Sequence, residues 1–159
     1  MQFEIRTSGP HDIGAIQYLL SLQFGEHANT LKSDAIARAV EGLVARPQYG
    51  TILLASKGAV SVGIATLSFT WTLEHGGLSA WLDELYVIPQ EREHGVGTLL
   101  AEAAIAEARR NGCVAIDLEV EAGHERAENL YQRLGFNRRH RQRYGKRLAS
   151  SVPGNRASP

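Results

Sequence analysis

The sequence contains one cysteine, Cys113, so it can form no internal disulfide and no cysteine cluster around a metal. Its histidines are scattered without the paired spacing of a zinc site, and we expect no metal. No run approaches the roughly 20 apolar residues of a membrane span. The segment from Met1 to Ile16 lacks the basic and apolar regions of a signal peptide. These absences predict a protein of the reducing cytoplasm, without a membrane partner.

Acidic side chains are missing from the C-terminal part of the chain. Residues 1–128 contain 9 basic and 17 acidic side chains, whereas residues 129–159 contain 8 basic and none that is acidic. An acidic body favours cationic substrates, and a basic end favours phosphates or RNA. Solvated surface is the simpler alternative for both.

The 159 residues suffice for one domain with a sizeable core. Alternating apolar residues predict strands, and apolar residues at helical spacing predict helices. We expect strands over about residues 3–6, 51–55, 62–69, 81–88 and 114–120, and a last hairpin over 136–148. Helices are expected to open at Pro10 and to cover 33–45, 96–110 and 125–134. This order predicts a single-domain α/β mixed sheet over residues 1–148, followed by a disordered tail over 149–159.

The segment after the strand at 81–88 has the clearest chemical signal. The strand stops at Pro89, a polar turn follows, and a helix begins at Gly95 and Gly97. Amides at a helix start lack internal partners, the helix dipole is positive there, and glycine lets an anion approach closely. With the cation Arg92, these features predict a pyrophosphate site. A P-loop lysine and the third glycine of a dinucleotide fingerprint, near Leu100, are both absent.

Arg92-x-x-Gly95-x-Gly97, directly after Val87-x-Pro89, resembles the acetyl-CoA signature of the GNAT superfamily of N-acetyltransferases. The resemblance implies a GNAT-type mixed sheet with helices on both faces, and acetyl-CoA as co-substrate. It implies that the backbone of Leu85, Tyr86 and Val87 binds the pantetheine arm like an added strand. The residues implied to hold the pyrophosphate through their amides are Arg92, Glu93, His94, Gly95, Val96, Gly97 and Thr98. Glu93 replaces the family's usual glycine, and beside a phosphate its carboxylate is unfavourable unless it points away.

A second segment, His124 to Phe136, is similar to the family's Asn-x-x-Ala-x-x-Leu-Tyr-x-x-x-Gly-Phe pattern. The resemblance gives Tyr131 the position whose phenol reaches the CoA sulfur, and it adds His124 and Asn129 to the cofactor-binding residues. His124 stands where the family usually has asparagine, and a surface position at a helix start is its alternative. A core position is the alternative for Tyr131. A phenol with a pKa near 10 suits proton donation to a leaving thiolate.

Asp83 and Glu84 interrupt an otherwise apolar strand. An alkylammonium must lose a proton before it attacks a thioester, and a carboxylate can accept that proton. Strand alternation sends adjacent side chains to opposite faces unless a bulge intervenes, so we expect one of the two to face the substrate. A salt bridge or a solvated strand end is the alternative. The strand is similar to the acid-rich strand of diamine acetyltransferases. Candidates for an amine pocket, or equally for the core, are Tyr18, Phe24, Trp71 and Trp81.

The sequence therefore predicts an acetyl-CoA-dependent N-acetyltransferase that acts on a primary amine, favouring a small cationic molecule. Direct attack in a ternary complex is expected, because Cys113, at a helix–strand junction, is poorly placed for a covalent intermediate. A noncatalytic acyl-CoA-binding or RNA-binding module on the same fold is the alternative, with the basic run Arg138 to Arg143 as its support. For the enzyme we do not expect nucleic acid as a partner, and a homodimer is left open.

Overall fold

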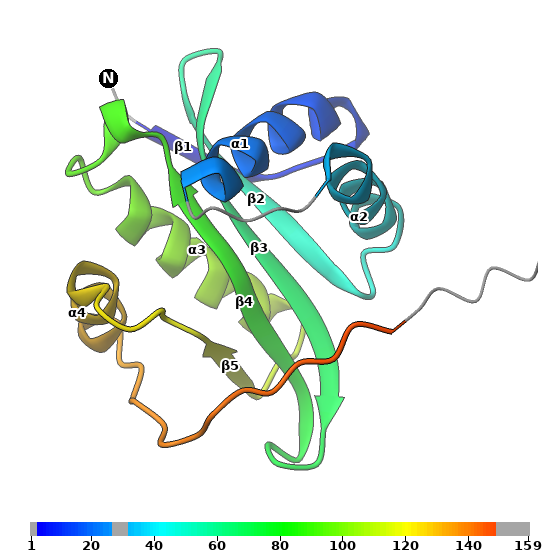
Figure 1. Ribbon diagram of the computed structural model, residues 1–159, viewed down its shortest axis with the longest axis vertical. Helices are drawn as coiled ribbons and strands as arrows, with labels where there is room; N and C mark the ends of the chain where they lie inside the picture. The colour runs from blue at the N-terminus through cyan, green and yellow to red at the C-terminus, as the bar shows by residue number, and fades with distance from the viewer. Residues whose placement is uncertain (1–2, 27–31, 149–159) are drawn as a thin grey trace, which may run out of the picture.

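The computed structural model describes residues 3–26 and 32–148, and a five-stranded sheet forms its centre (Figure 1). The strands lie in chain order: β1 (Phe3–Thr7), β2 (Gly50–Lys57), β3 (Val60–Thr72), β4 (Gly77–Val87) and β5 (Ala115–Leu118). The first four pair antiparallel, and β5 pairs parallel with β4.

Helices cover both faces of this sheet. A 3₁₀ turn, η1 (Pro10–Asp12), leads into α1 (Ile13–Glu26), which lies with α2 (Ser33–Ala45) on one face. A second 3₁₀ turn, η2 (Pro89–Glu91), follows β4, and α3 (Val96–Arg110) and α4 (Glu125–Arg133) lie on the other face. Within the described ranges, no helix has the length and apolar character that crossing a membrane requires.

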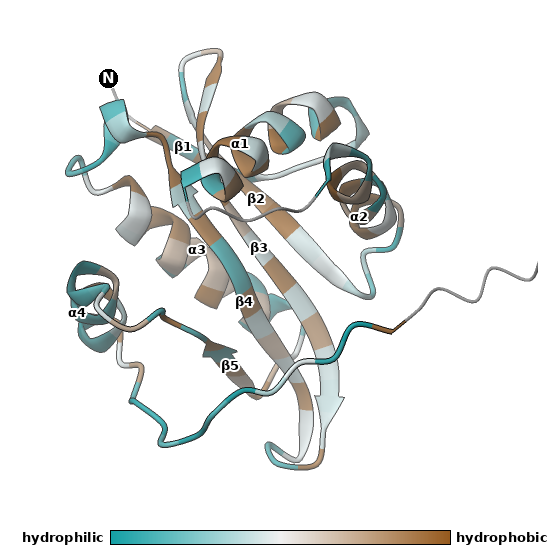
Figure 2. Ribbon diagram, in the orientation of Figure 1, coloured by the Kyte–Doolittle hydropathy of each residue, from teal (hydrophilic) through white to brown (hydrophobic). Residues whose placement is uncertain are grey.

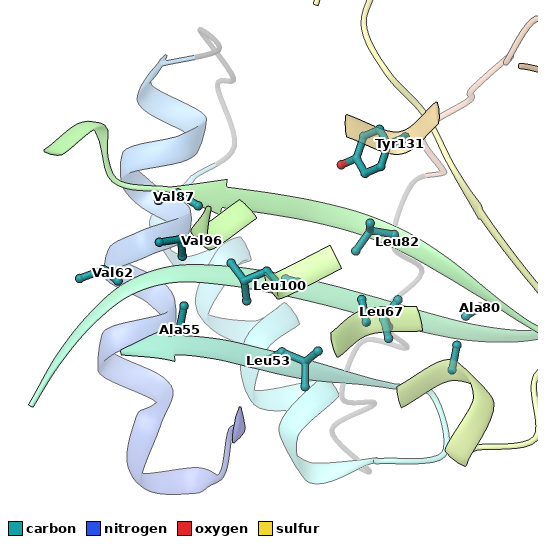
Figure 3. Close-up of a cluster of buried hydrophobic side chains, with 13 residues drawn as sticks. Leu53, Ala55, Val62, Leu67, Ala80, Leu82, Val87, Val96, Leu100 and Tyr131 are labelled. Carbon is teal, nitrogen blue, oxygen red and sulfur yellow. The ribbon is translucent and has the colours of Figure 1, made fainter. Parts of the chain in front are cut away.

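Each central strand buries side chains on both faces, which explains their nearly continuous apolar sequences. On β2, Leu53 enters the core beneath α3, and its neighbour Leu54 enters the core beneath α1 and α2. Figure 3 shows part of the α3-side core, and Figure 2 shows the apolar residues concentrated on the strands and inner helix faces. This α3-side core contains Leu53, Ala55, Val62, Ala65, Leu67, Ala80, Leu82, Val87, Val96, Leu100, Ala104, Ala108 and Tyr131.

The predicted α/β sheet with helices on both faces is confirmed, and α2 has the predicted bounds. The predicted hairpin over residues 136–148 is wrong, because no strand is present there and residues 137–148 form an irregular segment. This segment has six Lys or Arg side chains, and its two large apolar side chains, Tyr144 and Leu148, are exposed. It therefore has no apolar face to bury against the sheet. The tail predicted for residues 149–159 lies outside the described residues.

Gly50 begins β2 at a position where a side chain does not fit. A Cβ there would lie 2.0 Å from the backbone oxygen of Leu67 on β3. Because backbone must move to relieve this overlap, Gly50→Ala should lower the free energy of unfolding by about 3 kcal/mol in chemical denaturation. Gly14→Ala, in α1, is the control, since its Cβ would meet nothing within 4 Å. Equal stability of the two variants would contradict this packing.

Candidate active site

Strands β4 and β5 separate at the centre of the molecule. They pair only from Ser79–Ala115 to Leu82–Leu118, so beyond Leu82 the β5-facing edge of β4 is open in the described structure. The amide of Ile88 donates to the Val62 carbonyl on β3 at 3.0 Å. By strand alternation, the backbone groups of Leu85 and Val87 then point to the open edge. Those of Tyr86 point to β3, so an added chain could bond Leu85 and Val87 only.

A β-bulge at Asp83 changes the direction of the acidic pair. On β3, Leu67 lies opposite Leu82 and Thr66 lies opposite Glu84, so Asp83 is an extra residue without a partner. Leu82 and Leu85 pack into the α3-side core. The two residues between them, Asp83 and Glu84, both contact groups on the α1/α2 side. The extra residue breaks the strand alternation, so both carboxylates lie on this side of the sheet. That only one of them faces the substrate stays a prediction.

Both carboxyl groups are shifted toward their neutral forms. Burial raises the pKa of Glu84; a hydrogen bond from Gln23 opposes this, and the nearby Asp83 charge adds to it. Partial desolvation raises the pKa of Asp83 as well, although this residue is exposed, and a hydrogen bond from Ser68 and the Arg143 charge oppose the shift. A carboxylate whose pKa is raised is a stronger base than one in water.

An apolar cavity of about 160 Å³ lies beside Glu84. Residues of α1, α2 and the sheet line it, and Thr66 and Glu84 supply its polar groups. Gln23, on the inward face of α1, is buried; its Nε2 donates to Glu84, and its Oε1 has no partner among the described residues. This arrangement can receive an apolar body that bears a positive or hydrogen-bond-donating group.

The polar turn after β4 leads directly into α3. The helical ladder begins with the Leu99 amide, which donates to the Gly95 carbonyl at 3.1 Å, so the amides of Val96, Gly97 and Thr98 precede it. Gly95 has φ +82°. Gly97 lies inside the helix, and a Cβ there would meet only the side chains of Leu130 and Leu85, at 3.9 Å. The protein itself therefore leaves room for a Cβ at residue 97.

Glu93 adopts a backbone conformation that suits glycine. Its φ is +70°, and it is the one non-glycine residue of the described chain with positive φ. Its carboxylate pairs with Nη1 of Arg126 on α4 at 2.9 Å. The turn thus keeps a glycine-like geometry with a glutamate in place, and the charge is directed to α4. The neighbouring His94 is exposed.

The Arg92 side chain turns toward α1. Its Nη2 contacts both carboxylate oxygens of Glu26 at 2.9 and 2.7 Å, and its Nε donates to the Val87 carbonyl at 2.9 Å. The Tyr86 hydroxyl also donates to Glu26, at 2.7 Å. Burial, followed by this contact, raises the pKa of Tyr86 to about 12. In this arrangement Arg92 joins the end of α1 to the end of β4.

Tyr131 projects from α4 beside β4 (Figure 3) and is nearly buried. Its ring meets the ring of Phe136 edge-on, with centroids 5.6 Å apart. Burial raises its pKa to about 12. Tyr131 and Trp81 both line a cavity of about 390 Å³ that adjoins the end of β5. The phenol therefore stays protonated near neutral pH and faces the region where β4 and β5 separate.

The other predicted residues lie at the edge of the site or outside it. His124 and Asn129 are exposed, at the start and on the outer side of α4. Phe24 lines the smaller cavity, whereas Tyr18 and Trp71 are exposed, with 61% and 74% of their surface accessible.

Sequence reasoning missed several polar residues around the acidic pair. Gln23 had a signal, since it lies four residues after Leu19 on the apolar face of α1. Ser68 and Arg143 had none, because nothing in the sequence pairs them with Asp83. Glu26, the distant partner of Arg92, was missed for the same reason.

Comparisons with known proteins agree on one family. The model of the acetyltransferase (GNAT) family matches residues 14–136. Thialysine N-epsilon-acetyltransferase of Mus musculus is 27% identical over 82% of this chain and 82% of its own. Aminoglycoside N(6')-acetyltransferase type 1 of Klebsiella aerogenes is 33% identical over 64% of this chain and 67% of its own. An integron cassette protein from the mobile metagenome of Cole Harbour salt marsh has a TM-score of 0.81 at 28% identity, covering 93% and 92% of the two chains.

The backbone at Glu93 generates a prediction about stability. A left-handed conformation costs a non-glycine residue about 1 kcal/mol or more. Glu93→Gly should therefore unfold at a higher temperature than Glu93→Ala, by about 1 kcal/mol in free energy. Both variants lose the Arg126 pair, so their difference isolates the backbone. If Glu93→Ala were as stable as Glu93→Gly, the left-handed conformation would be refuted.

Proposed function

We propose that this chain, which belongs to the acetyltransferase (GNAT) family, transfers an acetyl group from acetyl-CoA to a primary amine of a small cationic molecule. It is an acetyl-CoA-dependent N-acetyltransferase. The observation that carries the proposed acceptor is the bulge at Asp83, which gives the α1/α2 side two neighbouring carboxylates. The names of two relatives, for thialysine and aminoglycoside, support small molecules that bear amino groups.

The residues present fit acetyl-CoA, which supplies the activated acetyl thioester. The open edge at Leu85 and Val87 offers backbone groups to the pantetheine arm. The amides of Val96, Gly97 and Thr98 offer donors to the pyrophosphate. Because the Arg92 guanidinium is paired with Glu26, the backbone amides of the turn supply most of the contact with the pyrophosphate. Arg126, paired with exposed Glu93, is a nearby cation.

We assign the role of general base to Glu84, directly or through a water molecule. It adjoins the cavity between α1, α2 and the sheet, and burial and Asp83 raise the pKa of its carboxyl group. Gln23 fixes one of its oxygens. Asp83, beside it, attracts the positive charge of the acceptor and keeps Glu84 basic. This role deepens the expectation that either carboxylate could accept the proton.

We assign Tyr131 to the leaving sulfur. With a pKa of about 12 its phenol is a weaker acid than the free side chain, so complete transfer to a thiolate of pKa roughly 8.5 is uphill. A hydrogen bond from the Tyr131 hydroxyl to the sulfur, as negative charge develops there, stabilises the transition state more effectively.

Cys113 packs against the α3-side core, and burial raises the pKa of its thiol. A thiol kept neutral is a poor nucleophile, which supports direct attack by the amine in a ternary complex. A single cysteine also agrees with a reducing cytoplasmic setting.

A panel of amines tests the proposal. Release of CoA thiol from acetyl-CoA should rise with diamines, amino sugars or basic amino acids and should saturate with each. Release from none of these amines, by protein that binds acetyl-CoA, would contradict it.

Gly97→Val should weaken acetyl-CoA binding strongly while the protein stays folded. The structure has space for a Cβ at this position, so a loss in Gly97→Ala reports the approach of the pyrophosphate to the backbone and not a clash within the protein. Calorimetry should give a Kd raised by about 100-fold or more, with Gly97→Ala intermediate. Wild-type affinity in the valine variant would show that Gly97 serves only the helix.

Glu84→Gln should lower kcat/KM by about 10² to 10⁴-fold, and Asp83→Asn by less. With a monoamine, the acid limb of the wild-type pH profile should lie above the ordinary carboxyl range of about 4. Asp83→Asn should move this limb to lower pH, since the pKa of Glu84 falls when its negative neighbour is removed. An unmoved limb, or full activity of both variants, would refute these roles.

Tyr131→Phe should lower kcat about 10- to 100-fold, with Kd for acetyl-CoA nearly unchanged, because a hydrogen bond to a charged sulfur is lost. An acyl donor whose thiol has a lower pKa should recover much of the loss. Equal losses with both donors would instead assign Tyr131 to packing with Phe136.

A further inference from the structure

The α1/α2 side of the sheet is covered at one end only. Toward the β3–β4 turn it presents the Trp81 ring, and Asp117 on β5 lies directly opposite Trp81. Glu119 lies one residue beyond the end of β5 and lines the same cavity as Trp81. Asp117 already contacts Nε2 of His75 at 2.6 Å. Glu74 lines this cavity as well, and the bulge brings Asp83 to this side of the sheet.

A cation of the chain itself occupies this place. The guanidinium of Arg143 lies over the Trp81 ring, 5.5 Å from its centroid, and its Nη1 contacts Glu119 Oε2 at 2.7 Å. Its charge also acts on Asp83. An aromatic face with carboxylates beside it is the combination that recognises alkylammonium and guanidinium groups.

The segment that brings Arg143 there is held only loosely. Figure 1 shows it crossing in front of the sheet, and Figure 2 shows its polar composition. The contacts that attach it to the sheet are those of Arg143 and an exposed ion pair of Arg141 with Glu74 at 2.8 Å. Among the described residues, no backbone hydrogen bond joins 138–148 to the sheet. Exposed ion pairs contribute little, so a dissolved cation can compete with Arg143.

We propose that Trp81, Asp83 and Glu119 form a subsite for a second positive charge of the acceptor, which displaces Arg143 on binding. The inference rests on the proposed function, because it takes the reacting amine to lie at Glu84. It names the substrate class as di- and polycationic amines. On binding, the second ammonium group of the substrate takes the place of the Arg143 guanidinium.

The strand rise gives the scale of the distance between the two charges. Residues rise about 3.3 Å each along a strand, so the Cα atoms of Trp81 and Glu84 are about 7 to 10 Å apart. A diamine with six carbons between its nitrogens spans about this distance when extended. A molecule of the same length with only one amine has no second charge, so Arg143 stays in the subsite.

The test compares kcat/KM for 1,6-diaminohexane and 6-amino-1-hexanol, measured as release of CoA thiol. The diamine should be preferred at least about fivefold, beyond the twofold factor of its two amino groups. Glu119→Gln should remove most of this preference. Similar values for the two molecules would overturn the subsite while leaving the proposed function intact. Turnover of neither would overturn the subsite, and release of thiol with no amine of the panel would overturn the proposed function as well.

Arg143→Gln tests the competition. It should lower KM for the diamine about two- to fivefold, because Arg143 no longer fills the subsite. Arg147→Gln removes the same charge from the same exposed segment and should leave KM unchanged. An increase of KM in Arg143→Gln, or equal shifts in both variants, would overturn the assignment of Arg143 as an internal competitor.

Discussion

Strands β4 and β5 share a ladder of only four residue pairs, ending at Leu82 and Leu118, and the site depends on this early separation. A longer ladder would satisfy the backbone groups of Leu85 and Val87 and leave no edge for an extended ligand. The bulge at Asp83 begins where the ladder ends. The same short stretch of β4 therefore provides both an open edge and two carboxylates.

In the proposed reaction, one face of the sheet serves the acetyl donor and the other face serves the acceptor. From the α3/α4 face, the start of α3 offers amides and Tyr131 offers a phenol to the acetyl donor. From the α1/α2 face, Glu84 and its cavity approach the same separation with a base for the acceptor. In the function that we propose, donor and acceptor reach one point from opposite sides, as direct attack in a ternary complex requires.

Most of the fold could be predicted from the sequence because its strands and helices bury regular apolar patterns, as α2 illustrates. The glycine turn and the acidic pair were also recognisable. The bulge was not, since an apolar pattern does not reveal one extra residue in a strand. The partner of Arg92 was hidden for another reason: Glu26 lies 66 residues away in the sequence. The hairpin prediction failed because residues 137–148 lack an apolar face, so ion pairs to Glu74 and Glu119 hold them in place of a ladder.

The most direct measurement of the central claim is a crystal structure of the protein with CoA and a diamine bound. We expect the pantetheine arm along β4, bonded to the backbone of Leu85 and Val87, with its sulfur beside the Tyr131 hydroxyl. One amine of the acceptor should lie at Glu84 on the opposite side. CoA bound away from the β4 edge, or a carboxylate pair divided between the two faces of the sheet, would contradict the account.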